Sequence, residues 1–241
     1  MNITIKNTVQ EMGKASGELA AQEIRKSIKE KGFANIILAT GTSQFQTLNY
    51  LASQENIPWD CVNMFHLDEY LGLPITHNAS FRKYLKERFI DKLAPNLKSV
   101  HLIDGESDGE LECQRLGNVI KKYPIDLAMV GIGENGHLAF NDPPADFETE
   151  EAFLVVELDH ACRNQQFSEG WFESFNAVPK QAISMTIRQI MKSAKIICTV
   201  PDERKSKAVE NCLRGEVSHL YPASILQQHP DCELFLDVAA A

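Results

Sequence analysis

The sequence predicts a doubly wound α/β fold, in which a mostly parallel sheet carries helices on both faces. Short apolar runs, such as residues 33–39 and 125–130, alternate along the chain with helical patterns of ten or more residues. Such runs are typical of strands that are buried on both faces, and their alternation with helices indicates crossover units. The 241 residues suit one large domain, residues 1–241, because neither a repeat nor a convincing linker interrupts them.

The expected elements follow one another in a regular order. A first strand is expected at residues 2–6, and a long amphipathic helix at residues 8–31 that Gly32 ends. Further strands are expected at residues 33–39, 61–65, 99–103, 125–130, 153–158, 196–200 and 233–236. Further helices are expected at residues 44–53, 78–89, 108–122, 182–193 and 202–213.

The composition excludes several functional classes. A formal net charge of -9 argues against a nucleic-acid-binding surface, which normally carries a basic patch. Every apolar run is shorter than the ~18 residues of a membrane span, and the first residues have no signal-peptide pattern. The six cysteines show neither a CxxC pair nor the Cys/His spacing of a zinc site. We therefore expect a cytoplasmic protein that binds neither a metal nor a membrane.

Ligands of such sheets bind beyond the carboxyl ends of the strands, and three of these places are unusual here. The first is the turn TGTS at residues 40–43, directly after a buried run. Gly41 allows a ligand to approach the backbone closely. The hydroxyls of Thr40, Thr42 and Ser43, with the free amides of a helix start, would form an anion cradle. An ordinary turn with Ser43 as N-cap explains the same pattern equally well.

The second place is the segment HLDEY at residues 66–70, which follows the apolar run 61–65. Two adjacent carboxylates at a strand end are an unusual choice for structure alone, since buried acids are costly unless they are paired. Asp68 could serve as a general base whose pKa is set by partial burial. The alternative is that Asp68 caps the next turn and Glu69 is solvated.

The third place is the segment GIGENGHLAFNDP at residues 131–143. Its glycines, among them Gly133 and Gly136, allow a tightly folded backbone after a buried strand. His137 would enter the cleft, and Asp142 lies close enough behind it to orient the ring or relay a proton. This grouping favours an acid/base role for His137 over a purely structural one.

Two other segments belong near the same edge of the sheet. Lys205 begins a helix after the run 196–200 and could reach a phosphate, although a solvated helical face explains it as well. Residues 142–151 (DPPADFETEE) have the least pattern in the chain. We interpret them as a mobile loop beside the site.

Five segments together resemble one known family. The segments ATGTS, FHLDEYLGLP, GIGENGHLAFNDP, VPKQAIS and PASILQQHP, in this order, are similar to those of glucosamine-6-phosphate deaminase and, less closely, of its relative 6-phosphogluconolactonase. The resemblance implies a Rossmann-like fold related to ribose-5-phosphate isomerase. It also implies an enzyme of amino-sugar catabolism that turns glucosamine 6-phosphate and water into fructose 6-phosphate and ammonia. Neither a metal nor an organic cofactor takes part in that reaction.

The resemblance also implies roles for single residues. Asp68 matches the base that moves a proton between C2 and C1, and His137 matches the group that opens the pyranose ring. Asn135 stands beside that histidine, where many members have Asp and others Asn. Asp142 stands where the family usually has Glu. The side chain of Asp142 is one methylene shorter, which shifts the carboxylate by ~1 Å.

The phosphate end shows both matches and departures. The family's cradle hydroxyls and its phosphate-binding lysine are matched by Thr42, Ser43 and Lys205. Without gaps, Glu169 falls where the family has the arginine that grips phosphate. Arg163 or Arg188 is a candidate to replace that arginine.

Two other functions remain compatible with these residues. One is hydrolysis of a 6-phosphosugar lactone, in which His137 would activate water and Asp68 would have no proton to move. The other is a non-catalytic protein that binds a sugar phosphate, which the exchanges at Asp142 and Glu169 motivate. In each case the expected partner is a small sugar phosphate, and a homo-oligomer is compatible with the sequence.

Overall fold

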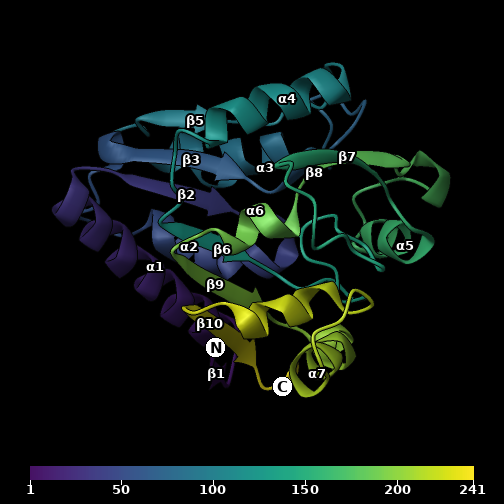
Figure 1. Ribbon diagram of the computed structural model, residues 1–241. Coiled ribbons are helices and arrows are strands. Elements are labelled where there is room, and N and C mark those ends of the chain that lie inside the picture. Colours follow the sequence, from purple (N-terminus) through teal and green to yellow (C-terminus); the bar gives the residue numbers. More distant parts are fainter.

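The computed structural model describes all residues, 1–241. Its main layer is a parallel sheet of seven strands in the order β1-β10-β9-β6-β2-β3-β5 (Figure 1). These strands are β1 (Asn2–Lys6), β2 (Ala34–Leu38), β3 (Val62–His66), β5 (Ser99–His101), β6 (Leu127–Val130), β9 (Lys195–Val200) and β10 (Cys232–Asp237). The predicted doubly wound α/β fold is confirmed, and all seven strands were expected within a few residues of these bounds.

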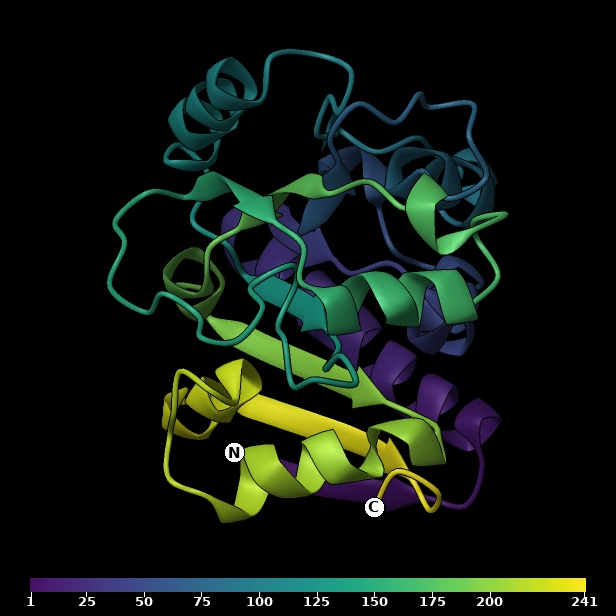
Figure 2. The same ribbon diagram turned by 90° about the vertical axis from the view of Figure 1, so that its right-hand side faces the viewer.

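Helices cover both faces of this sheet, as Figures 1 and 2 show. The helices are α1 (Val9–Lys31), α2 (Phe45–Ala52), α3 (Phe81–Arg88), α4 (Gly109–Ile120), α5 (His160–Ser168), α6 (Ile187–Met191) and α7 (Ser206–Arg214). Side chains of β2 alternate between two hydrophobic clusters: Ile36 packs with α1, α2 and α3, and Ile37 packs with α4, α6 and α7. The alternation follows from the pleat, which sends successive side chains to opposite faces.

The pairing of α1 and α2 depends on small residues. A Cβ atom at Gly13 would lie 2.3 Å from Cβ of Gln46, so α1 approaches α2 more closely than any larger residue allows. The ends of α1 follow the expected chemistry: the side chain of Thr8 accepts a hydrogen bond from the Glu11 amide, and Gly32 ends the helix at φ 81°.

A second sheet corrects the prediction for residues 182–193. These residues were expected to be helical, but β8 (Gln181–Met185) pairs antiparallel with β4 (Asp68–Tyr70) and β7 (Phe153–Glu157). Ile183 and Met185 alternate as strand residues, whereas the helical spacing begins only at α6, after Thr186 as N-cap. The pairing partners are distant in sequence, so the local pattern does not reveal them.

The small sheet and α5 lie beyond the ends toward which the strands of the main sheet point (Figures 1 and 2). Residues 142–151, interpreted from sequence as a mobile loop, run nearby and are anchored at two places. The amide of Ala145 donates to the carbonyl of His219, and the ring of Phe147 stacks on the His219 imidazole at 4.3 Å. None of the helices is both long and apolar enough to span a membrane.

Candidate active site

A pocket opens at the carboxyl ends of the four adjacent strands β9, β6, β2 and β3. It is the position at which doubly wound sheets bind ligands. Residues from all three unusual strand ends line it, together with the end of α5 and the start of the helix after β9. The lining residues with polar side chains are Thr40, Thr42, Ser43, Gln44, Asp68, His137, Gln165, Gln166, Glu169 and Lys205. The structure therefore brings the predicted cradle, the predicted base and the predicted imidazole into one cavity.

The turn after β2 forms the cradle end of the pocket. Gly41 has φ 88°, a left-handed conformation that glycine adopts without strain. The side chain of Gln44 fixes the turn to the sheet: it donates to the carbonyl of Val130 at 3.4 Å and accepts from Thr199 Oγ1 at 3.0 Å. These contacts hold the hydroxyls of Thr42 and Ser43 just beyond the carboxyl end of β2.

Lys205 supplies a buried positive charge to this cradle. Its Nζ donates to Ser43 Oγ at 2.9 Å, which leaves two of its three hydrogens for a ligand. The residue is only 6% exposed. Burial lowers the pKa of Lys205, and the carboxylates of Glu169 and Glu134 act in the opposite direction.

Asp68 projects into the other half of the pocket from the first position of β4. It is 7% exposed, and no protein group donates a hydrogen bond to its carboxyl. Burial, followed by the charge of the neighbouring Glu69, raises the pKa of Asp68 to about 8. An unpaired carboxyl with such a pKa can accept a proton from a carbon acid near neutral pH.

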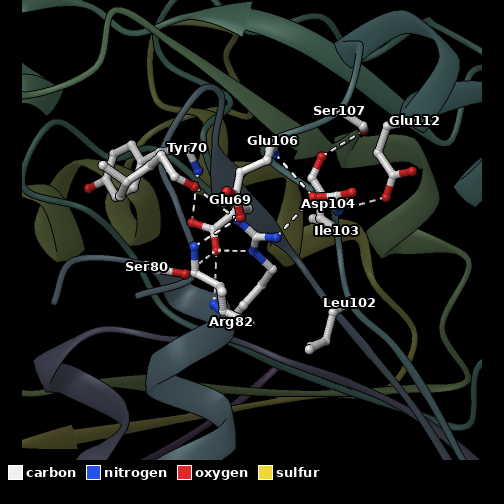
Figure 3. Close-up of polar contacts among 12 residues, drawn as sticks. Glu69, Tyr70, Ser80, Arg82, Leu102, Ile103, Asp104, Glu106, Ser107 and Glu112 are labelled. Atoms are coloured by element: carbon white, nitrogen blue, oxygen red, sulfur yellow. Dashed lines mark hydrogen bonds and ion pairs between the residues drawn. The ribbon is translucent and has the colours of Figure 1, made fainter. Parts of the chain in front are cut away.

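Glu69 is fully buried and points away from the pocket, contrary to the alternative in which it was solvated. Its carboxylate accepts hydrogen bonds from the Ser80 hydroxyl at 2.8 Å, from the Phe81 amide at 3.1 Å and from the Arg82 amide at 2.9 Å (Figure 3). Together these bonds tie the end of β4 to the first turn of α3.

Arg82 completes this network behind Asp68. Its guanidinium donates from Nε to Glu69 at 3.3 Å, from NH1 to Asp104 at 2.9 Å and from NH2 to Glu106 at 3.1 Å (Figure 3). One cation thus joins β4 and α3 to the loop after β5. The backbone that carries Asp68 is fixed although its own carboxyl has no partner.

His137 lies opposite Asp68, in the loop after β6. Its Nδ1 is 3.2 Å from Asp142 Oδ1, a charge-pairing distance with poor hydrogen-bond alignment. A Cβ atom at Gly133 would lie 2.2 Å from the imidazole, so only glycine permits this ring position. The amide of His137 donates to Asn135 Oδ1 at 3.0 Å, which fixes the loop on the other side.

Asp142 has several partners, unlike Asp68. Asn135 Nδ2 donates to Asp142 Oδ1 at 3.0 Å, and the Asp159 amide donates to Oδ2 at 3.1 Å. Burial alone would raise the pKa of Asp142, but the contacts with His137 and Asn135 outweigh it and hold this pKa below its usual value. An ionised carboxylate beside Nδ1 orients the imidazole.

His137 and Asp142 form, with Cys162 of α5, a group of side chains that could bind a metal ion. One ligand atom each from His137, Asp142 and Cys162 lie within 4.8 Å of one another. The fit to a metal is poor, because burial and the nearby Asp142 raise the pKa of the Cys162 thiol well above its usual value, and metals bind the thiolate. The sequence prediction of a metal-free site stays a prediction.

The two arginines proposed from sequence do not line the pocket. Arg163 NH2 donates to the carbonyls of Phe175 at 3.2 Å and Val178 at 2.9 Å, and its guanidinium lies over the Phe175 ring. Arg188 pairs with Glu150 at 2.6 Å on the loop of residues 142–151. The expectation that either one replaces the phosphate arginine is therefore wrong: both guanidinium groups are engaged elsewhere.

Sequence reasoning missed three polar lining residues: Gln44, and Gln165 and Gln166 of α5. All three are buried, and Gln165 Oε1 accepts from the Glu134 amide at 2.9 Å. The sequence offered no clear signal for them, because glutamine is usually exposed and the burial of these side chains is seen only in the structure.

Comparison with known proteins identifies the family. The sequence pattern of the family described as glucosamine-6-phosphate isomerases/6-phosphogluconolactonase matches residues 7–234. The chain belongs to this family. The resemblance expected from the five sequence segments is thereby confirmed.

Similar proteins with a described activity cover nearly the whole chain. A glucosamine-6-phosphate deaminase of Staphylococcus haemolyticus is 36% identical over 230 residues, which are 93% of each chain. One of Clostridium acetobutylicum is 35% identical over 246 residues, covering 100% of this chain and 99% of the relative. The solved structure of a monomeric glucosamine-6-phosphate deaminase superposes with a TM-score of 0.89 at 30% identity, covering 100% of this chain and 98% of that one.

More distant members of the family share the fold. A 6-phosphogluconolactonase from Shewanella baltica superposes with a TM-score of 0.82 at 16% identity, with 99% and 98% of the two chains covered. That likeness extends to the architecture and carries no information on the substrate. The doubly wound fold is therefore common to both branches of the family.

Proposed function

We propose that this protein is a glucosamine-6-phosphate deaminase: it isomerises an amino-sugar 6-phosphate and releases the amino group as ammonia. The observation that carries the proposal is the pairing of two differently tuned acid/base groups in one cavity with an anion cradle. Asp68 is unpaired with a raised pKa, and His137 is oriented by an ionised Asp142. The relatives named glucosamine-6-phosphate deaminase support the same substrate.

His137 would act first, on the closed sugar ring. Opening the pyranose requires a proton on the ring oxygen and loss of a proton from the C1 hydroxyl. An imidazole that a carboxylate orients can carry out both transfers near neutral pH. Asp142 would position His137 and does not itself need to touch the sugar.

Asp68 would then move a proton between two carbons. Its carboxylate removes the proton at C2 of the open-chain aldehyde while His137 gives a proton to the C1 oxygen, and this leaves an enolamine across C1 and C2. Returning that proton to C1 gives a C2 iminium, to which water adds. Collapse of the adduct releases ammonia and leaves the ketone, so that glucosamine 6-phosphate and water yield fructose 6-phosphate and ammonia.

The cradle would hold the phosphate far from these reacting carbons. Thr42, Ser43 and Lys205 offer hydroxyl and ammonium donors, which bind phosphate oxygens through charge-assisted hydrogen bonds. Anchoring one end of an extended sugar positions C1 and C2 between Asp68 and His137, and such positioning supplies much of the rate enhancement in enzymes.

We place this activity in amino-sugar catabolism in the cytoplasm. All six cysteines are free thiols, which suits a reducing compartment. The chemistry needs neither a metal nor an organic cofactor, because each step is a proton transfer or an addition of water.

The test is ammonia release from a panel of hexosamine 6-phosphates, with hydrolysis of 6-phosphogluconolactone measured alongside. We expect ammonia from glucosamine 6-phosphate and its loss in Asp68→Asn. A chain that opens the lactone with Asp68→Asn unharmed, and that releases no ammonia, would have the lactonase function instead.

A further inference from the structure

The cradle contains a carboxylate as well as a lysine. Glu169 lines the same pocket as Ser43 and Lys205, just beyond the end of α5. These three residues also line a shallower hollow that continues outward from the pocket. A negative group therefore faces the place where the proposed phosphate would lie.

Neutral donors hold this carboxylate in position. Gln165 Nε2 donates to Glu169 Oε1 at 3.0 Å, and Trp171 Nε1 donates to Oε2 at 3.3 Å. No lysine or arginine lies within ion-pair distance of it. Each carboxylate oxygen has two lone pairs, so Glu169 keeps acceptor capacity for a ligand.

The charges around the cradle do not favour a dianion. Lys205 is the buried cation, and Glu169 is the charge that acts on it most strongly. The other cation nearby, Arg204, already pairs with Asp202 at 2.8 Å and with Glu134 at 3.5 Å. Three carboxylates thus stand against two cations, and a doubly charged phosphate beside Glu169 would add to this excess of negative charge.

We propose that Glu169 is a specificity-determining residue that makes this pocket bind a phosphate group in its singly charged, protonated form in preference to the doubly charged form. The inference rests on the proposed function, in which the cradle holds the substrate's phosphate. A singly charged phosphate keeps a P–OH group that donates to Glu169, while its unprotonated oxygens accept from Lys205 and Ser43. A doubly charged phosphate has only acceptors to offer the carboxylate and is repelled.

The surrounding groups are spread over several elements. Lys205 and Arg204 lie between β9 and α7, Glu134 in the loop after β6, and Tyr70 and Tyr84 on β4 and α3. Burial raises the pKa of both tyrosines, so they remain neutral. Asp68 titrates at the far end of the pocket, and each variant must therefore be compared with the wild type at the same pH.

Inorganic phosphate and inorganic sulfate test the preference, because both are tetrahedral but sulfate has no proton to donate. We would measure their dissociation constants by calorimetry at about pH 6 and about pH 8. The wild type is expected to bind phosphate at least ~10-fold more tightly than sulfate at the lower pH. Its phosphate affinity should fall about fivefold at the higher pH, as the fraction of singly charged phosphate falls.

Two variants and one control assign the effect to Glu169. In Glu169→Gln the preference over sulfate should vanish and sulfate should bind more tightly, whereas Glu169→Asp keeps the carboxylate and should keep the preference. Glu173→Gln removes an exposed charge from the same segment and should change nothing. Thermal unfolding of each variant shows whether it is folded.

The outcomes are separable from those of the proposed function. Sulfate binding as tight as phosphate binding in the wild type, phosphate affinity that rises with pH, or no phosphate binding at about pH 6 would each overturn the role of Glu169. Ammonia release from glucosamine 6-phosphate, measured on the same preparation, reports the proposed function independently. If the protein releases ammonia but binds sulfate as tightly as phosphate, the proposed function holds and the proposed role of Glu169 is wrong.

Discussion

Asp68 lines the pocket and Asp142 lies behind the pocket residue His137, and the surroundings of these two carboxyl groups have opposite effects. Asp68 has no hydrogen-bond donor, and burial raises its pKa to about 8. Asp142 accepts from Asn135 and Asp159 and contacts His137, and these partners hold its pKa below the usual value. An aspartate can thus take up a proton near neutral pH at position 68 and stays ionised at position 142.

The surroundings of the two carboxyl groups give them different acid/base roles. Environments that push two pKa values apart separate the group that moves a proton from the group that orients its neighbour. The carboxyl of Asp68 has no partner, but the backbone that carries it is held by the buried network of Glu69 and Arg82. The comparison predicts unequal responses to the same chemical change at the two sites.

The largest effect is expected for Asp68→Asn. An amide cannot accept the C2 proton, so kcat for ammonia release should fall by roughly 10³-fold or more. Steady-state kinetics would show the loss, and Asp60→Asn, an exposed aspartate, is the matched control. Activity within tenfold of the wild type would remove Asp68 from the base role.

Loss of Arg82 should give the next largest effect, on stability. Arg82→Met leaves Glu69 buried without its cation, which should lower the free energy of unfolding by about 3–5 kcal/mol. The control Lys86→Met breaks an exposed pair with Asp91 and should cost less than ~1 kcal/mol. Urea titrations of both variants make the comparison; equal losses would mean that the network does not support the Asp68 side.

Asp142→Asn is expected to have a smaller catalytic effect than the change at Asp68. It removes the charged partner that orients the imidazole, so kcat should fall about 10²-fold. Asp146→Asn, in the same loop and exposed, should leave kcat unchanged. A loss as large as that of Asp68→Asn would contradict the separation of roles.

The pH dependence should give the smallest change. Asp68 acts as a base only when ionised, so kcat at saturating substrate should rise by about tenfold per pH unit and level off near pH 8. Glu69→Gln removes the neighbouring charge and should move this limb to lower pH, whereas the amine of the substrate would not respond. A limb near pH 4 would mean that the pKa of Asp68 is not raised in the enzyme–substrate complex.

The sequence was sufficient to predict the sheet and the residues that meet at its carboxyl edge. Strands buried on both faces have a recognisable apolar pattern, and Asp68, His137 and the cradle were found because they directly follow such strands. Side-chain direction was not accessible in the same way. Arg163 and Arg188 have the right charge and approximate position along the chain, but their guanidinium groups turn toward a carbonyl pair and a surface glutamate.

Features that depend on residues distant along the chain could not be predicted from the sequence either. β8 forms a strand because β4 and β7 pair with it, and its five residues alone are compatible with the start of a helix. Glu69 is buried because Arg82 and the first turn of α3 bind its carboxylate, and no local sequence pattern predicts these contacts. Opposite tuning of two aspartates is likewise a property of their neighbours.

The most direct measurement of this tuning is a carboxyl ¹³C NMR titration of the free protein, with Asp68→Asn and Asp142→Asn used to assign the two signals. We predict one aspartate that titrates near pH 8 and disappears in Asp68→Asn. The signal that is lost in Asp142→Asn should belong to a carboxylate whose pKa lies below the usual value of aspartate. Two aspartates titrating together near the ordinary value would contradict the opposite tuning of Asp68 and Asp142.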